Sequence, residues 1–109
     1  MASFHIFKDS KNEFRFSLKA DNGEKILQSE GYKAKASAQN GIQSAKVNAP
    51  IDARYTRETS SNGKFFFTLR AANNEVIGTG EMYDSADNRD EGIADVKRLA
   101  PGATVKDIE

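Results

Sequence analysis

The chain has 109 residues, sixteen basic and sixteen acidic side chains, and no cysteine. This length indicates one domain, and the lack of cysteine excludes disulfides, thiol catalysis and cysteine-based zinc sites. No apolar run approaches the ~18 residues of a membrane-spanning helix, and no long apolar stretch follows Met1. A cytoplasmic protein is therefore expected.

One sequence unit occurs twice, at an offset of 51 residues and without a gap. Identical residues recur along the whole unit, at the pairs Phe14/Phe65, Phe16/Phe67, Leu18/Leu69, Ile26/Ile77, Tyr32/Tyr83, Gly41/Gly92 and Pro50/Pro101. A unit of about 50 residues buries too little surface to be stable alone. Residues 1–109 are therefore predicted to form a single domain, in which repeat one (1–51) packs against repeat two with its final strand (52–109).

Each unit opens with three predicted strands. In the first unit, residues 4–8 form a short extended segment, and after a turn at 9–12 a longer strand covers 13–20. Alternate residues of this strand are apolar, which is typical of a strand with one buried face. The turn at Asn22-Gly23 has hairpin chemistry, and a short strand follows at 24–29. The second unit repeats these elements, with its opening segment at 53–58, its long strand at 64–71 and its short strand at 75–80.

The pattern then changes to helical spacing in both units. Apolar residues fall on one side of residues 34–49 and, less regularly, of residues 86–100,. Asp84 and Asp87 suit the start of the second helix, because carboxylates are favourable near the positive end of the helix dipole. A proline follows each helix and ends it. Residues 103–108 match the opening of the second unit and are expected to add a strand at one edge of the sheet.

These elements predict an α+β fold made of two tandem β-β-β-α repeats. The antiparallel sheet is expected to be covered on one face by both helices, with an approximate two-fold relation between the repeats. Gly41 and Gly92 stand in the middle of the two helices, where each costs about 1 kcal/mol relative to alanine. A cost that occurs in both repeats indicates a close approach, which we expect to be helix against sheet.

The repeated motifs resemble a known family. The run Phe-x-Phe-x-Leu-Lys-Ala-x-Asn-Gly-Glu-x-Ile begins at Phe14, and it is followed by Ser-Glu-Gly-Tyr at 29–32, Asn-Gly-Ile at 40–42 and Asn-Ala-Pro at 48–50. This series is similar to the YegP-like family of small bacterial proteins with one or two such modules. The resemblance covers nearly the whole chain, although Asn74 replaces the turn glycine in the second copy. It implies the α+β fold, no known function and no catalytic residues.

Few patterns in the chain point to catalysis or metal binding. His5 is the only histidine, and neither Ser17 nor Thr68 has an identifiable base partner,. Acidic residues follow Tyr83 at the spacing of a helix face rather than of a calcium-binding loop; they are Asp84, Asp87, Asp90, Glu91 and Asp95. We therefore predict no catalytic residue, no cofactor and no metal ion.

An enzyme remains one alternative because Glu30 and Glu81 form a carboxylate pair of the kind used in glycoside hydrolysis. A repeat generates such pairs automatically, so the pair carries little weight. We expect Glu30 with Tyr32, and Glu81 with Tyr83, to lie separately, each where its own third strand enters its own helix.

The outward positions of the long strands suggest a binding surface. Arg15 and Lys19 share one face of the first strand, and Phe66 and Arg70 share the same face of the second. Aromatic and basic side chains on a sheet can bind single-stranded nucleic acid, but the zero net charge argues against it. The favoured hypothesis is a small, non-catalytic, monomeric protein-binding or accessory module, whose partner contacts the open sheet face or an edge strand. Phe66 is expected to be semi-exposed on the helix-free face.

Overall fold

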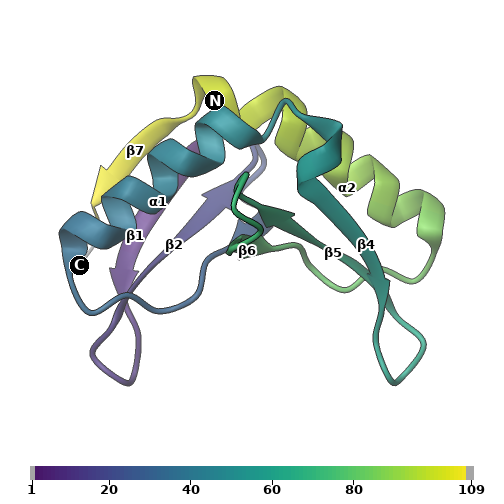
Figure 1. Cartoon of the computed structure of the whole chain (residues 1–109), viewed down its shortest axis with the longest axis horizontal. Coiled ribbons are helices and arrows are strands. Elements are labelled where there is room, and N and C mark those ends of the chain that lie inside the picture. Colours follow the sequence, from purple (N-terminus) through teal and green to yellow (C-terminus); the bar gives the residue numbers. More distant parts are fainter. Residues whose placement is uncertain (1, 108–109) are drawn as a thin grey trace.

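The computed structural model describes residues 2–107, and in this range seven strands form one sheet with two helices against it (Figure 1). This confirms the predicted α+β fold. In chain order the elements are β1 (Ser3–Lys8), β2 (Phe14–Lys19), β3 (Lys25–Gln28), α1 (Lys35–Asn48), β4 (Tyr55–Thr59), β5 (Phe65–Arg70), β6 (Val76–Thr79), α2 (Ala86–Leu99) and β7 (Thr104–Asp107).

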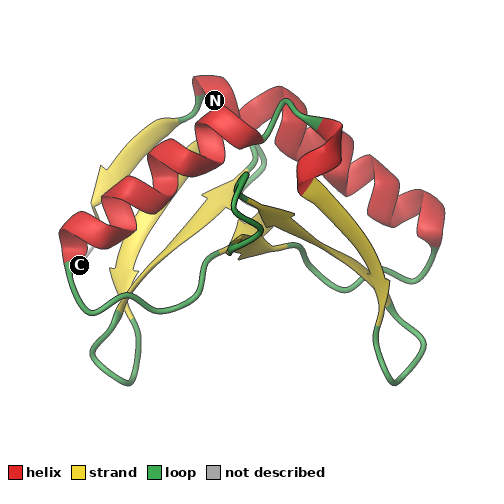
Figure 2. Cartoon of the chain, viewed as in Figure 1, coloured by secondary structure: helices red, strands yellow, loops and turns green. Residues whose placement is uncertain are grey.

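The strand order is β4-β5-β6-β3-β2-β1-β7, so each repeat contributes an antiparallel meander and the repeats meet at β3 and β6. At this junction Gln28 pairs with Thr79, its own counterpart 51 residues later. The pairing agrees with an approximate two-fold relation, which remains a prediction. Figure 2 shows both helices on one side of the sheet, with the β1–β2 and β4–β5 turns extending away from them.

The core lies between the sheet and the helices. Phe16 and Leu18 on β2, and their counterparts Phe67 and Leu69 on β5, are fully buried, as the alternating pattern predicts. Full burial of each such side chain contributes about 1.5–3 kcal/mol. Neither helix within residues 2–107 is long and apolar enough to cross a membrane.

The hairpin turns keep the same backbone in both repeats with different residues. Asn12 and its counterpart Gly63 have φ of 64° and 83°, and Gly23 and its counterpart Asn74 have φ of 85° and 72°. Glycine and asparagine are the residues that adopt this left-handed region most readily. The substitution at Asn74 therefore preserves the turn.

A serine caps the start of α2. Ser85 is the N-cap, and its hydroxyl accepts a hydrogen bond from the Asn88 backbone N–H at 3.0 Å. Asp84 lies just outside the helix and pairs with Lys64. The serine takes the cap because its short hydroxyl reaches the N3 amide, while Asp87 in the first turn still suits the helix dipole,.

The C-terminal segment adds an edge strand as expected. Thr104–Asp107 runs parallel to β1 at one edge of the sheet, and β4 is the other edge. The predicted strand also included Ile108, which lies outside the described residues.

Candidate functional site

A row of polar side chains crosses the helix-free face through all seven strands. Directly paired residues on neighbouring strands point to the same side of a sheet, and a single chain of pairs runs from edge to edge: Lys106, His5, Ser17, Gln28, Thr79, Thr68 and Thr56. Ser17 and Thr68 point outward as the alternation requires, yet their residues are only 3% and 7% exposed. Their short side chains lie between longer neighbours, so they form the floor of the face.

Two half-buried phenylalanines stand on this face, one in each repeat. Phe66 on β5 lies opposite Glu58 on β4, and Phe7 on β1 lies opposite Arg15 on β2. The aromatic ring is therefore on the first strand of one repeat and on the second strand of the other. The charged residue opposite the ring is basic in the first repeat and acidic in the second. Phe7 was missed in the sequence, although its position one residue after the buried Ile6 indicates the same face as His5.

The four residues predicted to face a partner share this face but form two groups. Arg15 and Lys19 lie on β2, and Phe66 and Arg70 lie on β5, with β3 and β6 between them. The structure thus places one basic group and one mixed group on opposite halves of the face.

Both arginines of these groups are held by the protein itself. The Arg15 Nε donates to Asp9 Oδ2 at 2.6 Å and its Nη1 donates to the Ser29 carbonyl at 3.1 Å. This guanidinium holds the pKa of Asp9 below its usual range. Arg70 donates from Nε to the Thr68 hydroxyl at 3.2 Å and from Nη1 to the Asn74 carbonyl at 3.1 Å. Their orientation is fixed before any partner binds.

His5 in the polar row is in a basic environment. Its ring shares a hydrogen bond of 2.8 Å with the Ser3 hydroxyl. Burial, then the ammonium groups of Lys19 and Lys106, lower the pKa of His5. Ser17 is the residue directly opposite it. Among residues 2–107 the charges that act on the ring are cationic, so no carboxylate in this range orients it as the base of a catalytic triad,.

Between the two halves lies a shallow depression of about 260 Å³. It is lined by Arg15, Gln28, Ser29, Glu30, Thr79, Gly80 and Glu81. Glu30 and Glu81 therefore share one depression, contrary to the expectation that they lie apart, because β3 and β6 are direct neighbours at the centre of the sheet.

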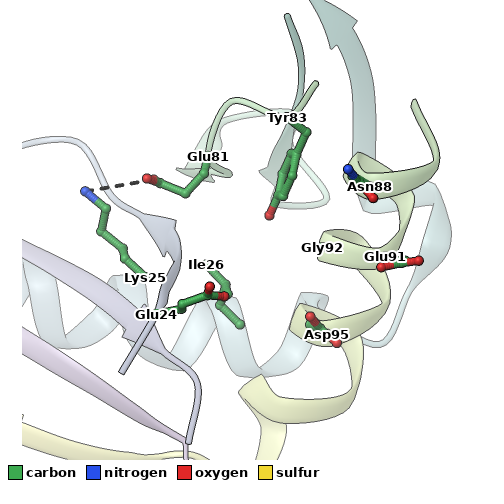
Figure 3. Close-up of a pocket in the computed structure, with 9 residues that line it drawn as sticks. All are labelled: Glu24, Lys25, Ile26, Glu81, Tyr83, Asn88, Glu91, Gly92 and Asp95. Atoms are coloured by element: carbon green, nitrogen blue, oxygen red, sulfur yellow. Dashed lines mark ion pairs between the residues drawn. The ribbon is translucent and has the colours of Figure 1, made fainter. Parts of the chain in front are cut away.

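The tyrosines do lie in separate pockets. Tyr83 points into a cavity of about 520 Å³ between α2 and the start of β3 from the other repeat (Figure 3). Burial, followed by Glu81, Asp95 and Glu24, raises the pKa of Tyr83. A Cβ on Gly92 would overlap this hydroxyl.

The equivalent pocket holds Tyr32. A Cβ on Gly41 would lie 2.8 Å from the Tyr32 hydroxyl oxygen and 2.9 Å from the Phe16 ring. The two mid-helix glycines thus make room for side chains that extend from the sheet toward the helices. These contacts are the close approach between helix and sheet that the sequence predicts.

The two tyrosine pockets differ in charge. The Tyr83 pocket has four carboxylates, from Glu24, Glu81, Glu91 and Asp95. The Tyr32 pocket, of about 270 Å³, has one, from Glu75. Within residues 2–107, no group of three or more acidic or histidine side chains is placed to hold a metal ion.

Both repeats of the chain match a known protein family. The family model "Domain of unknown function (DUF1508)" matches residues 9–55 and again residues 60–107. The chain belongs to the DUF1508 family. The two matches follow the two repeats, and the resemblance to YegP-like proteins is confirmed.

Relatives of this DUF1508 protein cover it almost completely. The UPF0339 protein YegP of Shigella flexneri is 53% identical over 104 residues, which are 95% of this chain and 94% of the relative. The solution NMR structure of yegP from E. coli, a protein of unknown function, has a TM-score of 0.92 at 51% identity and covers 97% of this chain and 91% of that chain. The structure of UPF0339 protein SO3888 from Shewanella oneidensis has a TM-score of 0.91 at 46% identity, covering 97% and 90%. These matches support the fold, and the descriptions of the family and of these relatives name no activity.

Proposed function

We propose that this DUF1508 protein is a non-catalytic module that binds a polypeptide across the helix-free face of its sheet. The observation that carries the proposal is the placement of Phe7 and Phe66, two half-buried rings on opposite halves of a mostly polar face. Aromatic side chains supply most of the binding energy in many protein interfaces. The proposal includes a monomer in the cytoplasm.

The charges beside the two rings indicate the chemistry of the partner. Arg15 beside Phe7 favours an acidic group, and Glu58 beside Phe66 favours a basic one,. Between them, the serine, glutamine and threonine side chains of the polar row can hydrogen-bond to a peptide backbone. A segment with opposite charges at its two ends therefore fits the face in one direction.

Nucleic acid and catalysis are less well supported. The Glu58 carboxylate beside Phe66 would repel the phosphates of a strand that stacks on this ring,. For catalysis, Glu30 and Glu81 line an open depression, and the Glu81 carboxylate already lies 3.8 Å from the Lys25 ammonium group.

The test is selection of peptides from a random library on the immobilised protein. Selected peptides are expected to carry acidic and basic ends, and Phe7→Ala and Phe66→Ala should each weaken binding at least tenfold, about 1.4 kcal/mol. Val47→Ala, at an exposed position on α1, is the matched control and should leave affinity unchanged. Urea melts check that the variants fold.

Measuring the affinity for oligothymidine at two salt concentrations distinguishes a peptide-binding face from a nucleic-acid-binding face. Tight, salt-sensitive binding of the strand that Phe66→Ala abolishes would show a nucleic-acid-binding face instead. Peptides that bind both phenylalanine variants as well as the original protein would also overturn the proposal.

A further inference from the structure

The first strands of the two repeats are equivalent but have different neighbours. β1 and β4 open the two repeats, and Phe4 corresponds to Tyr55. The outer side of β1 is covered by β7, which runs parallel to it and pairs Val105 with Phe4 and Asp107 with Ile6. Among the described residues no strand covers the outer side of β4 (Figure 1).

The outer side of β4 presents the backbone groups that β1 offers to β7. The Ser60 N–H donates to the Lys64 carbonyl at 2.8 Å at the end of the β4–β5 hairpin. Hydrogen-bonded pairs alternate along an antiparallel ladder, so the amides of Arg57 and Thr59 and the carbonyls of Tyr55 and Arg57 point outward.

The same alternation holds in the first repeat. There the Asp9 N–H donates to the Glu13 carbonyl at 2.9 Å, and the outward Ala2 carbonyl accepts from the Thr104 N–H of β7 at 3.2 Å. One difference shortens the free edge: the Tyr55 N–H is already bonded to the Asp52 carbonyl of a short 3-10 turn. The open ladder therefore begins at the Tyr55 carbonyl.

The cation available to an acidic residue of an added strand comes from a different element in each repeat. On the β1 side, Asp107 pairs with Lys35 on α1. The counterpart of Lys35 on α2 is Ala86, whereas the counterpart of the buried Ile6 on β4 is Arg57. A strand added to β4 would thus find its cation on the neighbouring strand instead of on the helix.

Arg57 is positioned to accept such a partner. Its Nη2 lies 3.4 Å from Asp52 Oδ1 and its Nε lies 3.3 Å from Asp90 Oδ1, and the side chain is 39% exposed. These partners hold the guanidinium against α2 and leave the backbone edge accessible. A charge on the inward side of an edge strand also disfavours apolar strands, so the edge selects a segment that carries an acid.

We propose that β4 binds an extended segment of a partner protein as an eighth strand, parallel to β4 and in the register that β7 adopts on β1. The segment has a small apolar residue opposite Tyr55 and an acidic residue opposite Arg57. Beside Tyr55 the apolar residue lies near Ile93 of α2, whose counterpart Ile42 lines the same groove as Val105. This site is separate from the open face and does not depend on the function proposed for it.

The chain itself supplies a probe. The segment 102–107, Gly-Ala-Thr-Val-Lys-Asp, has the required pattern, and a synthetic peptide of this sequence with blocked ends is titrated into the ¹⁵N-labelled full-length protein. We expect saturable NMR shifts of the Arg57 and Thr59 amides, and contacts between their strand and the peptide in a parallel register.

Charge reversal provides the controlled test. A peptide with lysine in place of the final aspartate should bind at least tenfold more weakly, and R57D should reverse this preference. R57Q should remove the preference for the peptide that ends in aspartate. It is the variant to use if R57D fails to fold. Phe66→Ala, on the open face, should leave binding of this peptide unchanged.

Four results would overturn the proposal. One is no saturable shift on β4, and another is a shift confined to β1 and β7, which would show that the peptide replaces the chain's own strand. The third is binding that ignores the charge at position 57. Concentration-dependent dimers of the free protein that involve the β4 edge would also assign the site to a second copy and not to a partner.

Discussion

The outer strands of the two repeats, β1 and β4, occupy the same place in their meanders but are stabilised differently. Phe4 on β1 is fully buried and packs edge-on against Phe16, with ring centroids 5.7 Å apart. Its counterpart Tyr55 is also buried, but its hydroxyl donates to the Ala49 carbonyl at 2.7 Å. Burial, then the charge of Asp52, raises the pKa of Tyr55 well above its ordinary value.

The difference follows from β7, which covers β1, whereas no strand among residues 2–107 covers the outer side of β4. Where β7 covers the edge, the inward side chain is Ile6 and is buried. Where the edge is open, Arg57 takes that place and pairs with Asp52 and Asp90. An apolar residue there would be exposed to solvent and to other strands. Two copies of one unit therefore differ most where their surroundings differ.

The inner side of the sheet shows a second exchange. Ser29 in the first repeat accepts a hydrogen bond from the Phe16 backbone N–H at 2.9 Å and donates to the Glu30 carbonyl at 2.8 Å. Its counterpart Gly80 has no side chain, and the Phe67 ring fills that space. The same core volume is occupied by a hydroxymethyl group in one repeat and by part of a ring in the other.

The largest effect is expected from separating the repeats. A fragment of residues 52–107 would lose β3 as the neighbour of β6 and β1 as the neighbour of β7. Because a unit of this size buries too little surface, it should not unfold cooperatively as a monomer in urea. Sedimentation distinguishes a self-paired dimer from a monomer. Cooperative unfolding of the monomeric fragment would show that the repeats are independent domains.

A smaller effect should distinguish the two inner positions. Gly80→Ser forces the Phe67 ring to move and should lower the free energy of unfolding by about 3 kcal/mol, as overpacked cores do. Ser29→Gly leaves the Phe16 N–H without its partner and should cost about 1–2 kcal/mol. Urea melts of both variants measure the difference. An unchanged stability of Gly80→Ser would mean that the ring has free space after all.

The smallest effect concerns His5, whose counterpart Thr56 does not titrate. Burial and the nearby lysines put the pKa of His5 below 6.5 in the folded protein. The unfolded chain therefore binds the proton more tightly, and stability should fall slightly as the pH drops below about 6.5, with no change above it. An NMR titration should give the lowered value, and Lys19→Ala should raise it. A pKa at or above 6.5 would contradict this environment.

The periodic patterns of the sequence by themselves determined the two repeats, the three strands and helix of each, and the residues that face the core. Those features depend on local spacing: alternation buries Phe16 and Phe67, and glycine or asparagine permits each turn. The same reasoning located Arg15, Lys19, Phe66 and Arg70 on one face.

Only the tertiary structure decided which strands became neighbours. The tail matches the start of a repeat, but nothing local states that β7 pairs with β1 and leaves β4 open. The meeting of β3 and β6 likewise brings Glu30 and Glu81 into one depression, and the row of longer neighbours buries Ser17. These outcomes depend on contacts between residues far apart in the chain, which hydrophobic periodicity does not encode.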